Sequence, residues 1–490
     1  MPAWFSRHDL YYLAPELVLV GGILGLLIAT ALTPRHRQGW LSWLALAALA
    51  ASAITLLSIS APAPVSVARG LLSFDAFATF FKGVFLLAAA LTVLLSMHYL
   101  DVESASHGEY MFLVLCATLG MMFMASGTDL ITIFVGLETM AIAFYILAGL
   151  LKRDRRSNEA GMKYFLLGTF SLGILLYGIS ILYGMSGTTN LRALAIAVAD
   201  HGRDPWLILA LILVVTGIGF KIAAVPFHMW APDVYEGAPT PITAFLSVGS
   251  KAASFAMLLR IFLEGLPSLS GDWTLLFYVL SVVTMFVGNI AALTQSNTKR
   301  MLAYSSIAHA GYLLIGVVAG TTRGVTAMLI YFVIYAFMQM GAFAVVVLLR
   351  RADAIGDELK DLSGLLSRQP FAAVAMLIFM LSLGGIPPTA GFMGKFWLFS
   401  AAIDAHYVWL AVLGVVNSAI SLYYYLRVVV FMFMKTESAG SRPVIAPGLA
   451  AALVIALAGT LILGVYPRPL FELAEISAKA LGVVGVAATF

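Results

Sequence analysis

The sequence predicts an all-α polytopic membrane protein with about fourteen transmembrane helices, and three observations support this fold class. First, 61% of the 490 residues are hydrophobic and only 11% are charged, with a mean hydropathy of +0.98. A soluble domain carries about 25% charged residues, so this chain has too few to cover a water-facing surface. Second, apolar stretches recur that are long enough to cross about 30 Å of hydrocarbon, which takes roughly 20 helical residues. Third, basic residues gather in alternate loops.

The apolar stretches define the expected helices. Polar or charged residues separate them, and no intervening segment is long enough for a separate soluble domain. The first stretch ends in Ala29-Thr30-Ala31, which resembles a signal-peptidase site, but Arg35 and Arg37 follow its long apolar run, so we expect an uncleaved helix. The expected spans are 12–32, 40–60, 76–99, 110–126, 129–151, 162–184, 206–228, 240–264, 274–295, 301–320, 325–349, 371–404, 407–434 and 445–466.

Two of these spans contain prolines at positions that predict broken helices. The span at 371–404 is too long for one straight crossing and has Gly-Gly-Ile-Pro-Pro at 384–388 in its middle. Proline lacks a backbone donor and clashes with the preceding turn, so we expect two half-helices joined by unwound chain. Pro226 interrupts the span at 206–228 in a comparable way.

The distribution of basic residues predicts the orientation. An even number of spans places both termini on one side, and loops that face the cytoplasm carry an excess of Lys and Arg. If both termini are periplasmic, seven basic residues face the periplasm: Arg7, Arg69, Arg192, Arg203, Arg323, Arg468 and Lys479. Fourteen then face the cytoplasm, namely Arg35, Arg37, Lys152, Arg153, Arg155, Arg156, Lys299, Arg300, Arg350, Arg351, Lys360, Arg368, Lys435 and Arg442.

Several functional classes are excluded by what the chain lacks. Its single cysteine, Cys116, excludes a disulfide framework, a zinc site built on cysteines and an iron–sulfur cluster held by this chain alone. The eight histidines are scattered and form no H-E-x-x-H arrangement. Neither a phosphate loop nor a Gly-x-Gly-x-x-Gly dinucleotide motif is present, and a net charge of +4 does not suggest nucleic-acid binding. We therefore expect a chain with no bound metal, cofactor or redox centre.

Seven basic residues lie inside or at the edges of the expected spans, where a charge costs about 2.5–3.5 kcal/mol at the bilayer centre. Lys82 and Arg260 lie within a turn or two of an interface, and we expect both to extend their charged groups to it. For Arg427 a structural and a functional role stay open. The other four are Lys163, Lys221, Lys251 and Lys395.

Four charged residues form the candidate site. At about 1.5 Å per residue, Lys251 lies roughly 16 Å into its span and Glu138 roughly 14 Å into the span at 129–151. Lys221 precedes Pro226 by five residues, and Lys395 follows the second break by seven. Irregular backbone at this depth is tolerated where it lines a watered cavity, and paired breaks point to a transport site. The alternative is that these charges form buried ion pairs that only hold helices together.

Buried lysines suit proton transfer because burial disfavours their charged form and a nearby carboxylate opposes that effect. Glu138 close to Lys221 would keep that lysine charged, and a larger separation would release its proton. Lys163, near the start of its span, could set the state of Glu138. His228 and His309 are candidate relay groups because histidine titrates near neutrality, although either could be a hydrogen-bonded packing residue.

Three segments resemble the antiporter-like subunits of respiratory complex I. They read GFKIAAVPFHMWAPDVYEGAP at 219–239, NTKRMLAYSS at 297–306 and LGGIPPTAGFMGKF at 383–396. The similarity extends over nearly the whole chain. Lysine at 395 and the lack of a long lateral helix after the last span make it most similar to subunit N among the three paralogues.

The resemblance implies a single membrane domain, 1–490, built around two inverted five-helix repeats. Three N-terminal helices occupy 1–109, the repeats occupy 110–264 and 274–434, and a last helix and tail occupy 435–490. It implies a coupled pair, Glu138 and Lys221, from which Lys251 and Lys395 continue a proton path across the midplane.

The resemblance also implies the biological setting, a bacterial inner membrane. The chain would be a subunit of an H⁺-translocating NADH:quinone oxidoreductase that couples electron transfer to proton pumping. Subunits K and M would lie beside it, and a peripheral arm would carry NADH, FMN, iron–sulfur clusters and quinone on other subunits. Two alternatives stay open: a subunit of a multisubunit Na⁺/H⁺ antiporter, and a scaffold that does not pump.

Overall fold

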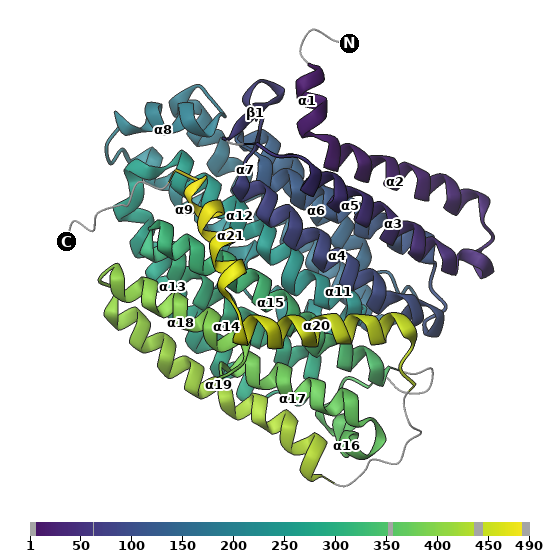
Figure 1. Ribbon diagram of the computed structural model, residues 1–490. Coiled ribbons are helices and arrows are strands. Elements are labelled where there is room, and N and C mark those ends of the chain that lie inside the picture. The colour runs from purple at the N-terminus through teal and green to yellow at the C-terminus, as the bar shows by residue number, and fades with distance from the viewer. Residues whose placement is uncertain (1–5, 62, 351–355, 436–443, 483–490) are drawn as a thin grey trace.

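Fourteen apolar crossings follow one another in the predicted order in the part of the chain that the structure describes. A computed structural model describes residues 6–61, 63–350, 356–435 and 444–482 (Figure 1). Twelve crossings are helical segments long and apolar enough to span a membrane, and the other two consist of shorter helices. Apart from the eighth, the unbroken crossings are α2 (Ala14–Leu32), α3 (Leu41–Ser58), α4 (Ala76–Val102), α5 (His107–Ser126), α6 (Leu130–Ala148), α7 (Arg155–Ser186), α13 (Ser270–Leu293), α14 (Thr298–Ala319), α15 (Thr322–Leu349), α19 (Val408–Met434) and α20 (Pro447–Val465).

Both predicted helix breaks are present. In the seventh crossing, α9 (Pro205–Lys221) ends before Pro226 and α10 (Trp230–Gly237) follows the break. In the twelfth, α17 (Pro370–Gly384) and α18 (Ala390–Asp404) are separated by five residues that include Pro387 and Pro388. The predicted span at 206–228 was therefore too short, because the helix resumes as α10 after Pro226 and the turn that follows it.

The eighth crossing is helical throughout but changes its winding twice. It consists of α11 (Thr240–Phe245), a π-helical turn η3 (Leu246–Ser250), α12 (Lys251–Leu259) and a second π-helical turn η4 (Arg260–Gly265). Single π-helical turns inside α-helices frequently occur at functional sites. Here one of them ends directly before Lys251.

Two hairpins in the two halves of the chain show the inverted repeat. The helices α5 and α6 pack closely against each other, and α13 and α14 do the same. The residue that caps the N-terminus of α6, Asp129, forms an isolated bridge with Asn190, and the corresponding cap of α14, Asn297, bridges to Glu358. These equivalent features lie at opposite ends of the bundle, as an inverted relation requires.

The end of the bundle that carries the loops at 33–40, 149–154 and 294–297 is called the basic end below. Most of the fourteen basic residues that the sequence predicts on the cytoplasmic side lie at this end. Two of the fourteen, Arg351 and Arg442, lie outside the described residues. The basic end is on the right of Figure 1, at the loop between α2 and α3.

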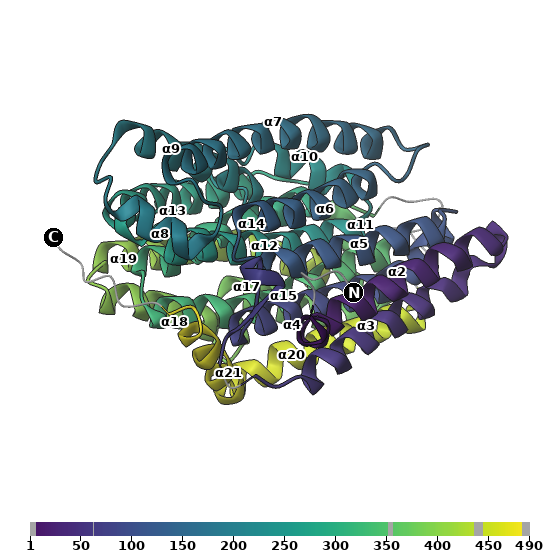
Figure 2. The ribbon, with the colours of Figure 1, turned by 90° about the horizontal axis from the view of Figure 1, so that it is seen from above.

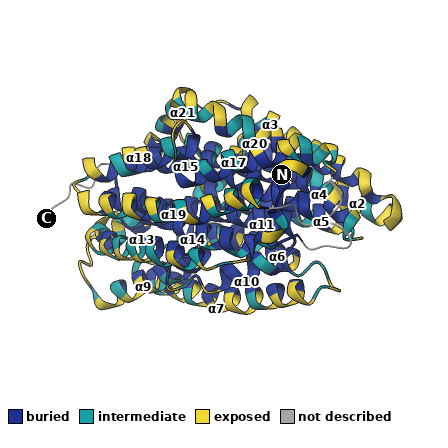
Figure 3. Ribbon diagram, turned by 90° about the horizontal axis from the view of Figure 1, so that it is seen from below, coloured by how far each residue is buried: buried dark blue, intermediate teal, exposed yellow. Residues whose placement is uncertain are grey.

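The eighth crossing, α14 and α15 form the centre of the molecule. In the eighth crossing, every residue of the most apolar stretch is buried. The corresponding buried fractions are 94% for α14 and 89% for α15. In Figure 2, α7 and α9 lie along one edge, and α3, α20 and α21 (Arg468–Lys479) lie along the opposite one. Figure 3 shows the exposed residues on these outer helices. The charged residues of the central helices are therefore enclosed by protein.

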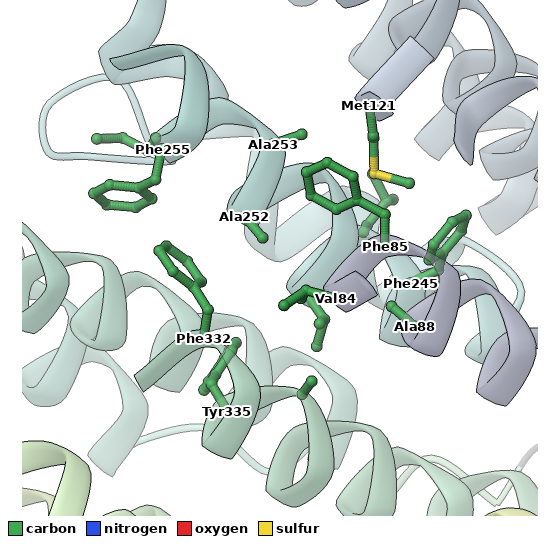
Figure 4. Close-up of a cluster of buried hydrophobic side chains, with 14 of the residues drawn as sticks. Val84, Phe85, Ala88, Met121, Phe245, Ala252, Ala253, Phe255, Phe332 and Tyr335 are labelled. Carbon is green, nitrogen blue, oxygen red and sulfur yellow. The ribbon is translucent and has the colours of Figure 1, made fainter. Parts of the chain in front are cut away.

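Aromatic and small side chains fill the centre where α4, α12 and α15 meet (Figure 4). Phe332 lies 5.5 Å from Phe255 and 5.6 Å from Phe81 between ring centroids. Ala252 and Ala253 leave room for these rings next to Lys251. This packing fixes the helix that carries the central lysine.

Shorter elements close the ends of the bundle. These elements contribute little to the candidate site. The loop that follows α15 contacts Lys299 through Asp357. The shorter elements are α1 (Arg7–Tyr12), η1 (Arg35–Trp40), a hairpin of β1 (Val65–Val67) and β2 (Leu72–Phe74) with η2 (Ala68–Gly70) between them, α8 (Leu191–Ala199), η5 (Pro267–Leu269), η6 (Leu359–Leu362) and α16 (Leu365–Arg368).

Candidate functional site

Lys221 is the last residue of α9 and lies in an aromatic enclosure at the first helix break. Its side chain is buried, and Nζ donates a hydrogen bond to the hydroxyl of Tyr145 at 3.2 Å. The ammonium group also lies over the rings of Tyr145 at 5.3 Å and of Tyr164 and Phe220 at 5.9 Å. Aromatic faces attract a cation through their quadrupoles without supplying a formal charge. The enclosure therefore holds Lys221 without a carboxylate in contact.

Glu138 is half-buried on α6, two helical turns before Tyr145 and on the same face of the helix. Within the described residues, its carboxylate has no cation within 4.0 Å, although it interacts electrostatically with Lys221. Glu138 also interacts electrostatically with Tyr145, whose hydroxyl binds Lys221. Glu138 and Lys221 are therefore near each other but not in direct contact.

Lys163 makes contacts other than the predicted one. Its Nζ lies 2.7 Å from Asp233 of α10 and 2.8 Å from Glu159 of its own helix. Asp233 also accepts a hydrogen bond of 2.6 Å from Arg300 of α14. Lys163 therefore belongs to an ion-pair group that joins the two repeats, and its predicted influence on Glu138 stays a prediction.

Lys251 lies at the centre of the molecule and, in the part of the chain that the structure describes, contacts no carboxylate. Its Nζ lies 2.5 Å from the Ser306 carbonyl oxygen and 2.6 Å from the Ser306 hydroxyl. The preceding π-helical turn places it there, because the extra residue shifts the following turn relative to a regular helix. Ser250, the residue before Lys251, lies near Tyr164, whose ring faces Lys221, but the Tyr164 hydroxyl makes no hydrogen bond within the described residues.

His309 lies one turn beyond Ser305 and Ser306 and is fully enclosed. Its Nδ1 lies 2.5 Å from the hydroxyl of Tyr331, and its Nε2 lies 3.1 Å from that of Tyr425. The Tyr425 hydroxyl is in turn 2.5 Å from the Ser305 hydroxyl. Every one of these hydroxyl groups can donate or accept a proton. His309 therefore occupies a hydrogen-bonded group next to the Lys251–Ser306 contact.

Lys395 lies against the second helix break. Its Nζ donates to the carbonyl oxygens of Leu383 and Gly384, at 2.9 and 3.2 Å, and to the Ser418 hydroxyl at 2.8 Å. It also lies 4.9 Å from the centroid of the Tyr312 ring, which contacts His309. Lys221, Lys251, His309 and Lys395 are therefore all buried, and each contacts a hydroxyl-bearing side chain: Tyr145 for Lys221, Ser306 for Lys251, Tyr331 and Tyr425 for His309, and Ser418 for Lys395.

His228 lies in the turn between α9 and α10 and is nearly buried. Its Nδ1 makes no hydrogen bond to protein in the described part of the chain. No hydrogen bond links it to the four lysine and histidine groups above, so its assignment as a relay stays a prediction.

The predictions for Lys82 and Arg260 were wrong, because both side chains point inward. Lys82 pairs with Glu16 of α2 at 2.6 Å, and both side chains are 2% exposed. Arg260 binds Asp75 at 2.7 Å and Glu264 at 2.5 Å. Acidic residues near the starts of other spans supply partners that the position of a basic residue within its own span does not show.

Arg427 has a structural role. It donates to the carbonyl oxygens of Leu293, at 2.8 Å, and of Gln295. These carbonyls follow the C-terminus of α13, where backbone acceptors lack helical partners. Arg427 therefore caps α13.

The tyrosine and serine partners of the lysines were missed by sequence reasoning. A tyrosine in an apolar span fits a packed core as readily as a relay, so residue type alone does not identify one. For the serines, position in the sequence was the signal that could have identified them, because Ser305 and Ser306 lie within four residues of His309.

Comparison with known proteins identifies the family. A family model described as the NADH:quinone oxidoreductase/Mrp antiporter transmembrane region matches residues 127–421. A relative from Trichlorobacter lovleyi named NADH-quinone oxidoreductase subunit N is 47% identical over 479 residues, which cover 97% of this chain and 98% of the relative. The chain belongs to the subunit N family of NADH-quinone oxidoreductases. The predicted resemblance is confirmed, and the alignment spans practically the full length of both family members.

Two solved structures share the fold of this family member. A chain of respiratory complex I from Thermus thermophilus has a TM-score of 0.81 and 34% identity, with 94% of this chain and 99% of that one covered. A chain of the Mrp complex from a Dietzia species has a TM-score of 0.80 at 24% identity, with 96% and 97% covered. The latter likeness shows the fold alone, so it does not favour the antiporter alternative over the subunit N family.

Proposed function

We propose that this chain translocates protons in the membrane arm of a bacterial NADH-quinone oxidoreductase. One observation carries the proposal: within the described residues, the five buried cations of the third, seventh, eighth and twelfth crossings fall into two groups that differ in their partners. Lys82 and Arg260 contact carboxylates, whereas the ammonium groups of Lys221, Lys251 and Lys395 contact only hydroxyls, carbonyls and aromatic rings.

The difference matters because a carboxylate fixes a buried cation in its charged form, whereas neutral partners do not. A neutral amine still donates N–H hydrogen bonds to a carbonyl or hydroxyl oxygen and can accept one from a hydroxyl. Lys251, for example, keeps its contacts with Ser306 whether it is protonated or not. The three lysines can therefore change charge without a rearrangement of the helices that hold them.

Glu138 is the switch in this mechanism. When its carboxylate approaches Lys221, the attraction favours the protonated lysine, and when it withdraws the buried charge becomes unfavourable. The proton then moves by way of Tyr164 and Ser250 toward Lys251, and onward through the His309 group to Lys395. Each hydroxyl accepts one proton as it donates another, so only the lysines and the histidine change charge.

The setting follows from the family and from the charge distribution. We assign the basic end to the cytoplasm, which places both termini in the periplasm of a bacterial inner membrane. Other membrane-arm subunits, among them K and M, would lie against the exposed apolar faces. The redox chemistry, with NADH, FMN, iron–sulfur clusters and quinone, belongs to other subunits of the complex.

The test is to change Glu138→Gln and Lys221→Ala separately in the assembled complex. Both variants should assemble, as judged by native electrophoresis, and pump far fewer protons per quinone reduced in proteoliposomes. Lys221→Arg should have a milder effect, because the charge persists but its pKa can no longer be tuned.

The matched control is the double variant Glu16→Gln/Lys82→Gln, which removes a buried ion pair from the N-terminal helices without leaving a lone charge. Its pumping should match the wild type. Normal pumping in an assembled Lys221→Ala complex would instead support the scaffold alternative.

A further inference from the structure

The second half of the broken seventh crossing, α10, is bound to both repeats by one shared carboxylate. Asp233 of α10 accepts a hydrogen bond of 2.6 Å from Arg300 of α14 and one of 2.7 Å from Lys163 of α7. Arg300 also donates to Glu236 of α10 at 3.1 Å. The helices α7 and α10 belong to the first repeat and α14 to the second, so Arg300 is a cation of one repeat that holds a half-helix of the other.

The position of α10 depends on such contacts. It has eight residues, and an isolated helix shorter than about 12 residues is marginal in water. It packs against α7 and α14. At its end Gly237 lies so close to α7 that an added Cβ would be 2.4 Å from the Arg156 carbonyl oxygen. What α7 and α14 bind therefore determines where α10 lies.

The first residue of α10, Trp230, supports the aromatic enclosure of Lys221. Its ring is stacked on Tyr164, with centroids 4.5 Å apart, and lies 5.4 Å from the ring of Phe220. Its indole N–H donates to the Phe220 carbonyl at 2.8 Å. Tyr164 and Phe220 are two of the three rings over which the Lys221 ammonium lies. Trp230 thus fixes the rings that face the lysine.

Both contacts of Asp233 lead to this stack. Trp230 precedes Asp233 by three residues, which is less than one helical turn and about 4.5 Å along the axis. On α7, Lys163 is the residue directly before Tyr164. Because a single helical turn moves as a unit and the stack is closely packed, a shift of α10 moves the Trp230 ring against Tyr164 and Phe220.

We propose that Arg300 of the second repeat is a positioning residue for Lys221. By binding Asp233 it fixes α10, and with α10 the Trp230–Tyr164 stack that supports the enclosure of the lysine. This inference rests on the proposed function, because it presumes that Lys221 takes up and releases a proton. It deepens that function by giving the second repeat a packed contact with the first lysine of the path, although Arg300 itself carries no proton.

Loss of Arg300 should leave the chain folded. Arg300 binds Oδ1 of Asp233 and Lys163 binds Oδ2, so Asp233 keeps its tie to α7 when Arg300 is removed. The side chains of Arg300 and Asp233 are 29% and 33% exposed, and ion pairs with this access to solvent contribute little to stability. The expected change is therefore in the placement of α10 rather than in assembly.

The first test is Arg300→Gln in the assembled complex, with protons pumped per quinone reduced measured in proteoliposomes. We expect a loss of pumping, and partial recovery in Arg300→Lys, because an ammonium can still pair with Asp233. The control is Arg323→Gln, which removes a cation of the same repeat that pairs with Asp404 at the end of α18, at 2.5 Å. Its pumping should match the wild type.

The second test asks whether Arg300 acts through Trp230. Trp230→Phe removes the indole N–H and part of the stack, and it should also lower pumping. Adding Arg300→Gln to Trp230→Phe should then lower pumping little further, because both changes act on one contact. Losses that multiply independently in the double variant would overturn the inference, since they would place the effect of Arg300 elsewhere.

The two proposals fail in different ways. Wild-type pumping in assembled Arg300→Gln, with Lys221→Ala impaired, would overturn the role of Arg300 and leave the proposed function standing. If Arg300→Gln does not assemble, wild-type pumping in Trp230→Phe would overturn that role in the same way. Wild-type pumping in assembled Lys221→Ala would overturn the proposed function itself.

Discussion

The N-terminal helices should owe a large part of their stability to a single buried carboxylate, that of Asp75. Both its oxygens accept from Nη2 of Arg260, at 2.9 and 2.7 Å, and the two side chains are 2% exposed. Arg260 also donates to Glu264 at 2.5 Å and to the Ala125 carbonyl at 3.1 Å. Asp75 thereby connects the start of α4 to η4, the turn that directly follows α12, the helix that carries Lys251.

The cost of losing this carboxylate has two parts. Breaking a buried ion pair by removing one partner costs about 3–5 kcal/mol, and the lower end applies because Glu264 remains to balance Arg260. Asp75 also caps α4 by accepting from the Ala78 N–H at 2.8 Å, and such a cap contributes about 1 kcal/mol. Asp75→Ala should therefore destabilise the chain by about 4 kcal/mol, and Asp75→Asn, which can still cap, by about 3 kcal/mol.

The assay is unfolding of the purified full-length chain by SDS, followed by circular dichroism. Asp204→Ala is the control, because Asp204 caps α9 by accepting from Trp206 but contacts no buried arginine. It should cost about 1 kcal/mol. Equal destabilisation by Asp75→Ala and Asp204→Ala would refute the reasoning, since it would mean that the contact with Arg260 adds nothing beyond the cap.

Three further changes test other parts of the structure. Gly120→Ala should destabilise the α5–α6 hairpin by about 1–3 kcal/mol, because an added Cβ would lie 2.5 Å from the backbone nitrogen of Met140. Gly168→Ala should reduce proton pumping, because its Cβ would lie 2.3 Å from the Tyr145 hydroxyl that holds Lys221. Asp357→Asn should gain stability relative to the wild type as the pH rises from about 4 to 7.

The glycine predictions have controls on the same or neighbouring helices. An alanine Cβ at Gly83 or at Gly173 would meet nothing within 4 Å. Gly83→Ala should leave the SDS midpoint unchanged, and Gly173→Ala should leave pumping unchanged. Loss of pumping in Gly173→Ala would show that α7 tolerates no added methyl group, and the Tyr145 explanation would then fail.

The pH prediction follows from the surroundings of Asp357. Burial raises the pKa of this carboxyl, while the positive charges of Lys299, Arg350 and Arg156 oppose the rise and Glu236 adds to it. The folded chain therefore retains a proton that the unfolded chain has already released, and the resulting stability is lost as the pH rises. Asparagine stays neutral throughout, so a constant difference between variant and wild type from pH 4 to 7 would contradict the raised pKa.

The number of crossings and the two breaks could be predicted from the sequence because each has a local cause. Apolar length decides whether a helix can cross a bilayer, and proline at 226, 387 and 388 removes backbone donors wherever the fold places it. The second half of the seventh crossing was missed because Trp230–Gly237 is short and moderately polar. Its helix depends on packing against α7 and α14.

The partners of the charged residues could not be predicted in the same way. Depth within a span gave the correct burial for Lys251, but it gave the wrong outcome for Lys82 and Arg260. Their partners, Glu16 and Asp75, stand 66 and 185 residues away along the chain, at the starts of other helices. Only the arrangement of the helices brings such pairs together, and the same holds for the contact of Lys163 with Asp233.

The two broken helices hold their lysines by different means, although both ammonium groups lie at the C-terminal end of a half-helix, that of Lys221 at its own helix α9 and that of Lys395 at the preceding helix α17. That end carries unpaired carbonyls and a partial negative charge, which favours a cation. At the end of α9 the Phe220 carbonyl accepts from the Trp230 indole at 2.8 Å, and Lys221 rests on aromatic rings instead. At the end of α17 the last carbonyls accept directly from Lys395.

The first lysine is therefore free to respond to a carboxylate outside its enclosure, and Glu138 on α6 is placed to supply that charge. Lys395, on α18, instead binds the last carbonyls of the other half-helix, α17, and has no acidic partner within 4.0 Å among the described residues. In the proposed mechanism the charge of Lys395 therefore responds to protons that arrive from Lys251 and His309, whereas the charge of Lys221 responds to Glu138.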